Sequence, residues 1–415
     1  MKKFFTIIFN MFLLSHISAQ TNSYTISMGP NYANQIFFSM QNGEIANVNN
    51  EDWDIAFSTD AFSSTIRIND GKGVELHTYH LGDTSSWINI NNSITNNLTN
   101  PMYNSDSDWS IGAFDVNTTT GLDYGWGVYS MVSHNIIGDS LFIIKTINGN
   151  YKKLWMESKS SGDYFFKYAN IDGSNLVNQT VSASNYGSKN LIYFSLDQNT
   201  IIDREPDSNL WDITFTKYIT DYPSPQGGMV PYPVTGVLSN NNIEIAKATG
   251  IANPMSYTDY SLHAFETDIN SIGYDWKSYQ GTYVIDVNRC YFVRDLSQNI
   301  WRIIFSGFDG MSTGNIEFNT TLVSNTSSKN IKGVNTFEVF PNPTNGNTNL
   351  IYDVESKENI VEIYNMTGEK IYTHSLLSNG LQTLELPTNY ISKGIYFVII
   401  TDNKNTLSRK KLIIQ

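Results

Sequence analysis

The sequence has 415 residues, enough for two to four domains, and it carries a net charge of −13 with a single cysteine. The acidic balance disfavours nucleic acid and anionic membrane surfaces as partners, because both repel a negatively charged protein. One cysteine, Cys290, excludes an internal disulfide, so buried apolar side chains must stabilise the fold. We expect Cys290 itself to be a buried structural thiol.

The first residues, MKKFFTIIFNMFLLSHISAQ, have the pattern of a secretory signal peptide. Lys2 and Lys3 precede an apolar run, and the small residues Ser18 and Ala19 close it. The run is too short to span a membrane, and no later segment offers about 18 consecutive apolar residues. We therefore expect residues 1–19 to direct export and to be removed, and we expect no transmembrane segment.

Residues 20–325 contain one sequence pattern twice, beginning with WDIAF at 53–57 and WDITF at 211–215. FFSM (37–40) and YFSL (193–196) precede these motifs, and three further matches follow them in the same order: DWSIGAF (108–114) with DYSLHAF (259–265), LDYGWGVY (122–129) with IGYDWKSY (272–279), and SLFIIKTINGNYKKLWM (140–156) with CYFVRDLSQNIWRIIF (290–305). Ordered matches of this kind indicate a tandem duplication, with copies at 20–180 and 181–325.

Each matched piece alternates as a β-strand does. In WDIAF the side chains of Trp53, Ile55 and Phe57 share one face, as expected for a strand with one buried side. Asn148-Gly149 joins two apolar runs, which predicts a tight hairpin. Helical periodicity is scarce, so we predict two mainly β domains. Their repeated aromatic residues are expected to fill the cores rather than to contact a ligand.

A different composition begins at residue 337, after a polar linker at 326–336. The segment VEIYN alternates as a strand does, and TGE then turns the chain into KIYTHSL. Proline residues and glycine punctuate FPNPTNG. A small β-sandwich of about 80 residues is the expected fold.

Four stretches of this tail form an ordered set: FPNPTNG, YNMTGEKIY, SKGIYFVII and the ending RKKLIIQ. They resemble the type A C-terminal sorting domain of the type IX secretion system. The motif positions are Phe340, Pro341, Asn342, Pro343, Gly346, Gly394, Tyr396, Lys410 and Lys411. The resemblance implies an immunoglobulin-like sandwich over 337–415 that the export machinery of the outer membrane recognises. It implies that the protein reaches the cell surface or the medium through the Sec pathway and then the outer membrane.

The repeats resemble the HmuY-type haem-binding proteins through WDIAF, the following TIRINDGKG, the Tyr-x-Trp-x-x-Tyr element and the hairpin after it. This resemblance implies all-β domains that take haem between loops at one end, with His or Met as the iron ligands. The chain departs from that family in having two copies, a sorting domain in place of a lipid anchor, and no histidine pair common to both copies.

The ligand candidates follow from this resemblance. In ELHTYHLGD, His77, Tyr79 and His80 follow a glycine turn, and either imidazole could bind haem iron. The second copy has Met229 in the corresponding region. The alternative is that these histidines are ordinary loop or strand-edge residues and that Met229 fills space.

No enzyme motif accompanies these residues. The sequence lacks G-x-S-x-G, H-E-x-x-H and a Walker loop, and Asp106 and Asp108 lack the further oxygen ligands of a calcium loop. We therefore expect a non-enzymatic binding protein whose cofactor would be haem. The alternative is a structural or adhesive surface protein that binds glycan or protein partners through exposed loops and aromatic side chains.

Overall fold

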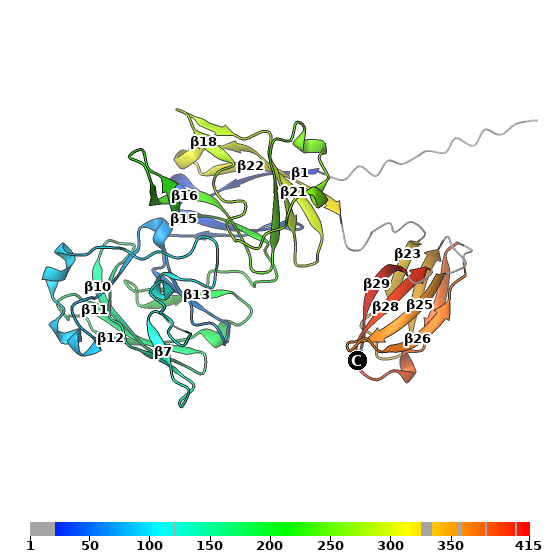
Figure 1. The fold of residues 1–415 in the computed structure, drawn as a ribbon, viewed down its shortest axis with the longest axis horizontal. Coiled ribbons are helices and arrows are strands. Elements are labelled where there is room, and N and C mark those ends of the chain that lie inside the picture. Colours follow the sequence, from blue (N-terminus) through cyan, green and yellow to red (C-terminus); the bar gives the residue numbers. More distant parts are fainter. Residues whose placement is uncertain (1–20, 120, 325–333, 355–358, 378–379, 403–404) are drawn as a thin grey trace, which may run out of the picture. The chain divides into compact units, whose positions relative to one another are not determined.

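The computed structural model describes residues 21–119, 121–324, 334–354, 359–377, 380–402 and 405–415. The chain divides into two compact units, with the boundary between Val323 and Ser324. Strands dominate both units and the described helical elements are short 3-10 turns (Figure 1), so the all-β prediction is confirmed. The predicted signal peptide at 1–19 and most of the predicted linker lie outside the described residues.

The first unit contains two lobes, each with its own hydrophobic core. We call residues 50–205 the first lobe, and residues 21–49 together with 209–323 the second lobe. The first lobe contains β4 (Ile55–Ser58), β5 (Ile66–Ile68), η2 (Asp70–Lys72), β6 (Glu75–Thr78), η3 (Thr84–Asn89), η4 (Asn92–Asn96), η5 (Ala113–Asp115), β7 (Gly127–Tyr129), β8 (Ile136–Gly138), β9 (Phe142–Lys145), β10 (Tyr151–Ser160), β11 (Asp163–Asn170), β12 (Val177–Ser182), η6 (Ala183–Tyr186), β13 (Leu191–Ser195) and β14 (Thr200–Ile202).

The second lobe contains β1 (Thr21–Ser27), η1 (Pro30–Tyr32), β2 (Asn34–Ser39), β3 (Gly43–Asn49), β15 (Ile213–Pro223), β16 (Met229–Ser239), β17 (Glu244–Ala248), η7 (Pro254–Ser256), η8 (Tyr260–Leu262), β18 (Lys277–Tyr279), β19 (Tyr283–Ile285), β20 (Cys290–Arg294), β21 (Ile300–Phe308), η9 (Gly310–Ser312) and β22 (Asn315–Ser324). Figure 1 shows the blue N-terminal strands lying among the green and yellow strands of this lobe.

Each lobe places a four-stranded sheet against a larger one. In the first lobe, β14-β13-β4-β5 packs on a sheet with the order β12-β11-β10-β8-β7, to which β9 and β6 are joined. In the second lobe, β16-β15-β2-β3 packs on β1-β22-β21-β20-β17. Phenylalanine rings meet between the two sheets in both lobes, Phe57 with Phe166 and Phe215 with Phe318, at 5.4 Å in each case. The apolar alternation of the strands therefore produces two similar cores.

The repeated hairpins are exchanged between the two copies. Strand β13, which carries YFSL, pairs with β4 of the first WDIAF motif, with Phe194 opposite Ile55. Strand β2, which carries FFSM, pairs with β15 of the second motif, with Phe38 opposite Ile213. Each Trp-Asp-Ile-x-Phe strand is thus completed by the hairpin of the other copy.

The aspartate of each motif fastens the exchanged hairpin. Asp54 Oδ2 accepts a hydrogen bond from Leu196 N at 2.7 Å, and Asp212 Oδ2 accepts one from Met40 N at 2.6 Å. Leu196 and Met40 occupy the same place in the two hairpin sequences. Both aspartates are buried, where an unpaired backbone amide would be costly. These matched contacts agree with the predicted duplication and explain why the motif contains an acid.

The lobes therefore differ from the predicted division at residue 180. Each core includes a hairpin from the other copy, so the chain passes from the first lobe to the second near residue 205. The repeated tryptophans are buried as predicted, with Trp53, Trp126, Trp211 and Trp276 exposed by only 8%, 0%, 2% and 1%. The predicted common face of Trp53, Ile55 and Phe57 is wrong, because Trp53 lies before β4 and clusters with Ala56 while the other two side chains enter the main core.

The second unit is a β-sandwich with one core. Its elements are β23 (Val334–Phe340), β24 (Thr348–Val354), β25 (Asn359–Asn365), β26 (Lys370–Ser375), β27 (Gln382–Leu386), η11 (Thr388–Tyr390), β28 (Gly394–Asp402) and β29 (Asn405–Ile414). The sheet β23-β24-β27 faces the sheet β26-β25-β28-β29. The sandwich was predicted from residue 337, and its first strand begins three residues earlier, at Val334.

Candidate functional site

The FPNPTNG loop of the second unit holds the last strand in place. Asn342 donates through Nδ2 to the carbonyl oxygen of Lys411 at 2.6 Å and accepts from Ile413 N at Oδ1 at 2.9 Å. Thr344 N donates to Ile413 O at 2.9 Å, and Gln415 N donates to Thr344 O at 2.7 Å. The loop motif and the C-terminal motif are therefore two sides of one contact, which we call the terminal clasp.

The other motif positions have mixed roles. Tyr396 is buried, and its hydroxyl donates to Ser392 O at 2.8 Å. Lys410 reaches Glu338 on β23 at 2.9 Å. Phe340 is exposed. The ion pair of Lys410 with Glu338 therefore ties the last strand of the sandwich to its first.

Four further motif positions lie at turns or strand starts. Pro341 and Pro343 flank the clasp residue, and the carbonyl oxygen of Pro341 accepts from Thr348 Oγ1 at 2.5 Å. Gly346 O accepts from Thr388 Oγ1 at 2.7 Å, and Gly394 begins β28. The sequence motif is therefore largely a set of structural contacts.

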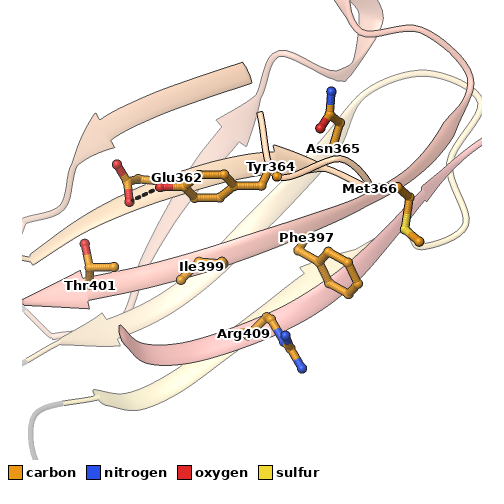
Figure 2. Close-up of a pocket in the computed structure, with 9 residues that line it drawn as sticks. Glu362, Tyr364, Asn365, Met366, Phe397, Ile399, Thr401 and Arg409 are labelled. Atoms are coloured by element: carbon orange, nitrogen blue, oxygen red, sulfur yellow. Dashed lines mark hydrogen bonds between the residues drawn. The ribbon is translucent and has the colours of Figure 1, made fainter. Parts of the chain in front are cut away.

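A groove of about 420 Å³ lies on the outer face of the sheet β26-β25-β28-β29 (Figure 2). Figure 2 shows Phe397 and Arg409 on neighbouring strands, and the Arg409 guanidinium lies 5.1 Å from the centre of the Phe397 ring. Tyr364 donates its hydroxyl to Glu362 at 3.0 Å, and Lys370 pairs with the same carboxylate at 2.8 Å. The groove combines an apolar floor with charged rims.

The sandwich matches a known family. Residues 338–415 match the model of the family described as secretion system C-terminal sorting domain. The predicted sorting domain of the type IX secretion system is confirmed. The protein is therefore exported to the cell surface or secreted across the outer membrane, and its tail interacts with the secretion machinery.

Other comparisons add little about the first unit. No curated protein matches the chain. Two solved structures from Porphyromonas gingivalis show weak similarity: PorZ, described as an essential bacterial surface component of the type-IX secretion system (9% identity, 72% of this chain and 53% of PorZ covered, TM-score 0.16), and dimeric latent PorU (11% identity, 91% and 40% covered, TM-score 0.17). The chain spans about half the length of PorZ. The resemblance of the repeats to HmuY-type proteins stays a prediction.

The predicted haem ligands do not lie together. His77 is on β6 rather than in a loop, and its ring is buried with Nδ1 3.0 Å from the carbonyl oxygen of Thr99. Tyr79 is buried in a small apolar cluster, and His80 is exposed at the turn after β6. Met229 is exposed in the second lobe. Because the His77 and Tyr79 side chains are both buried, only His80 and Met229 remain open to a ligand.

The described residues contain no group of three or more His, Cys, Asp or Glu side chains arranged to hold a metal ion.

The thiol of Cys290 is buried, as predicted, and burial raises its pKa to about 11. Asp106, considered as a calcium ligand, instead accepts hydrogen bonds from two side chains of the second lobe. In the part of the chain that the structure describes, no helix has the length and apolar character needed to cross a membrane.

The β15–β16 hairpin carries an exposed aromatic group that the sequence reasoning missed. Tyr222 lies 5.1 Å from Tyr232 and 5.7 Å from Tyr274, measured between ring centres. Tyr222 is 39% exposed and Tyr232 is 51% exposed, whereas most aromatic residues of this unit fill the cores. We call these three residues the tyrosine cluster. Figure 1 shows the green hairpin that carries two of them extending from its sheet.

The sequence explains why this hairpin extends. Strand β15 pairs with β2 only at Ile213–Phe215, so its later residues pair with β16 alone. Strand β16 lies at the sheet edge, where Pro231 and Pro233 are tolerated because no further strand needs their missing amide hydrogens. Gly227 and Gly228 form the tip with φ of 90° and 82°, a conformation that glycine adopts without strain. In the sequence, the segment YPSPQGGMVPYP, in which tyrosines stand beside prolines, is the feature that could have indicated this exposed hairpin.

A polar pocket of about 460 Å³ lies beside the loop before the second Tyr-x-Trp-x-x-Tyr element. Its lining consists of Lys247, Leu262, His263, Ala264, Glu266, Asp268, Asn270 and Ser271. His263 Nε2 lies 2.8 Å from the Tyr257 hydroxyl. The pocket therefore offers carboxylate, amide, hydroxyl and imidazole groups within one hollow.

The pocket and the tyrosine cluster are joined by two contacts. Asp106 Oδ2 accepts from Asn270 Nδ2 of the pocket at 3.0 Å and from Thr220 Oγ1 of β15 at 2.5 Å. Asp275, which follows Tyr274, pairs with Lys247 of the pocket at 3.2 Å. The two features are therefore adjacent parts of one surface.

Proposed function

We propose that this protein is a non-enzymatic binding protein of the cell surface or the medium, and that the tyrosine cluster is its principal contact surface. The observation that carries the proposal is the row of tyrosine rings formed by Tyr222 and Tyr232, which are exposed on the extended β15–β16 hairpin, and the half-buried Tyr274 beside them. Exposed apolar patches of this kind mark interaction sites, because burial against a partner removes them from water.

Tyrosine suits such a surface for two physical reasons. Its ring offers a large apolar area at a low entropy cost because the side chain has only two rotatable bonds. Its hydroxyl still bonds to water or to a partner. Delivery by the sorting domain would place this surface outside the cell. An adhesive role there requires only binding to a partner and no chemical reaction.

Beads coated with the full-length protein provide the test. They should attach to at least one immobilised surface among neutral polysaccharide, anionic polysaccharide and matrix protein. The Tyr222→Ala, Tyr232→Ala double variant should lose that attachment, while Tyr390→Ala, an exposed tyrosine of the sorting domain, should retain it. Equal attachment by the parent and the double variant would refute the proposal.

Haem binding is the second candidate, because His80 and Met229 are both accessible to a ligand. His80 belongs to the first lobe and Met229 to the second, so each residue would supply one axial ligand to a haem of its own. The second axial ligand of each haem would come from another group. Titration with haemin should then sharpen the Soret band in the parent, and His80→Ala or Met229→Ala should weaken it. No spectral change in the parent would remove haem as the ligand.

A further inference from the structure

We propose that the tyrosine cluster and the polar pocket together form a binding site for a neutral carbohydrate chain. This inference rests on the proposed function and names the ligand of the same surface. A sugar ring has an apolar face of C–H groups and a rim of hydroxyl groups. It therefore needs aromatic faces next to a mixed set of hydrogen-bond donors and acceptors.

The aromatic half of this requirement is met by a continuous row of rings. Tyr232, Tyr222 and Tyr274 follow one another at 5.1 Å and 5.7 Å, and the rings are tilted by 36° and 42°. Burial, together with the nearby Tyr222, Asp275 and Asp106, raises the pKa of Tyr274. Its hydroxyl is therefore neutral and able to donate a hydrogen bond at physiological pH.

The polar half is met by the pocket. Glu266 and Asp268 are exposed carboxylates that accept hydrogen bonds, and Asn270 and His263 offer donors as well as acceptors. Sugar hydroxyls both donate and accept, so this mixed set suits them. A hollow of about 460 Å³ is large enough to admit a ligand group, since small-molecule pockets measure about 300–1,000 Å³.

The two halves adjoin, so a chain of several sugars could contact both. Asp106 bonds to Thr220 beneath the tyrosine hairpin and to Asn270 of the pocket. Lys247 and Asp275 form a second connection beside Tyr274. Thr220 lies on β15 and Lys247 on β17, so each bridge ties loop residues of the site to a strand of the second lobe.

Charge selects a neutral ligand over an anionic one. Four carboxylates, Asp106, Glu266, Asp268 and Asp275, lie in or next to the site, and Lys247 is already paired with one of them. The whole chain carries a net charge of −13. A sulfated or carboxylated polysaccharide would be repelled by these like charges.

Affinity electrophoresis of the full-length protein tests this inference. One set of gels would contain a neutral polysaccharide: a β-glucan, a mannan or a dextran. A second set would contain an anionic polysaccharide: heparin or alginate. At least one neutral polymer should retard the protein, and the anionic ones should not. Retardation only by anionic polymers would overturn the assignment.

Variants then locate the site. Tyr222→Ala with Tyr232→Ala should weaken the apparent affinity about tenfold or more, because exposed aromatic anchors dominate contact surfaces of this kind. Asp268→Ala, in the pocket, should weaken it about threefold, the usual effect of losing one polar contact. Tyr390→Ala should leave it unchanged. Thermal unfolding of each variant checks that the fold is intact.

The outcomes separate this inference from the proposed function. Neutral-polymer binding that neither variant alters would place the site elsewhere and overturn the inference. Attachment of beads to matrix protein through the tyrosine cluster, with no retardation by any polysaccharide, would reject carbohydrate while leaving the binding role intact. Attachment to nothing would reject both.

Discussion

The indole of Trp53 packs edge-on against the ring of Tyr193, with the ring centres 4.9 Å apart, although the two residues belong to different copies of the repeat. Trp211 makes the same edge-on contact with Phe37 at 5.0 Å. Phe37 and Tyr193 hold the same position in the two hairpin sequences. The pair of contacts shows that each motif tryptophan packs on the exchanged hairpin.

Replacing Trp53 by alanine should therefore weaken the fold of the first lobe. We expect Trp53→Ala to lower the free energy of unfolding by about 3–5 kcal/mol, because it empties a buried aromatic site and removes the bond from Nε1 to Asn50. Denaturant unfolding followed by circular dichroism measures the change. Phe62→Ala, a fully exposed ring of the same lobe, should stay within about 0.5 kcal/mol of the parent.

Asp115 should make stability depend on pH. Burial raises its pKa to about 8, and Gly112 N donates to its Oδ2 at 2.7 Å. Because the folded pKa lies above the unfolded value of about 3.9, the stabilisation from protonation is complete below about pH 4 and is lost as the pH rises through about 8.

An asparagine at this position stays neutral at every pH and still accepts the hydrogen bond from Gly112. The stability advantage of Asp115→Asn over the parent should therefore grow from about pH 5 to about pH 9. Melting temperatures across this range measure it. Asp139→Asn, at an exposed position, should show no such trend; an advantage for Asp115→Asn that is constant with pH would contradict the prediction.

The terminal clasp should be needed for a well-formed sorting domain. Asn342→Ala removes two hydrogen bonds to the last strand and should cost about 1–2 kcal/mol in that domain. We expect a smaller fraction of the variant outside the cell, measured by immunoblotting of cell and medium fractions. Asn345→Ala, at an exposed position of the same loop, is the matched control and should be exported normally.

Removal of residues 337–415 should stop export without unfolding the first unit. The two units have separate cores, so the truncated protein should remain in the periplasm and keep its fold. All 8 tryptophans lie in the first unit, so the midpoint of unfolding monitored by tryptophan fluorescence should be unchanged. Normal recovery of the truncated chain from the medium would contradict the role of the tail.

Much of the architecture could be predicted because local patterns determine it. Alternation identified the strands, but it placed Trp53 on the wrong face: Trp53 precedes β4 and packs with Ala56 and Tyr193, not with Ile55 and Phe57. The exchange of hairpins could not be predicted. FFSM and YFSL carry nearly the same side chains, so either hairpin fits either WDIxF strand, and only the path of the intervening chain decides between them.

The candidate site was harder to predict because it also depends on pairing between strands that are distant in the sequence. His77 was expected in a loop because a glycine turn precedes it, but LHT continues the sheet through pairing with β9, a contact distant in sequence. The tyrosine cluster was missed because prolines normally indicate a loop, whereas at a free sheet edge they are compatible with a strand. Burial and exposure at both places depend on tertiary pairing.

The pairing of β1 with β22 joins the beginning of the first unit to its end, with Thr21 opposite Thr321. During synthesis the first lobe can close once its hairpin at 191–202 has emerged. In the second lobe, β1, β2 and β3 are synthesised first, but β1 cannot pair until β22 has been made. Contacts between such distant residues form slowly, so this lobe is expected to set the folding time of the whole unit. The second lobe therefore stays incompletely folded until β22 has been synthesised, so most of the first unit is made before this lobe can close.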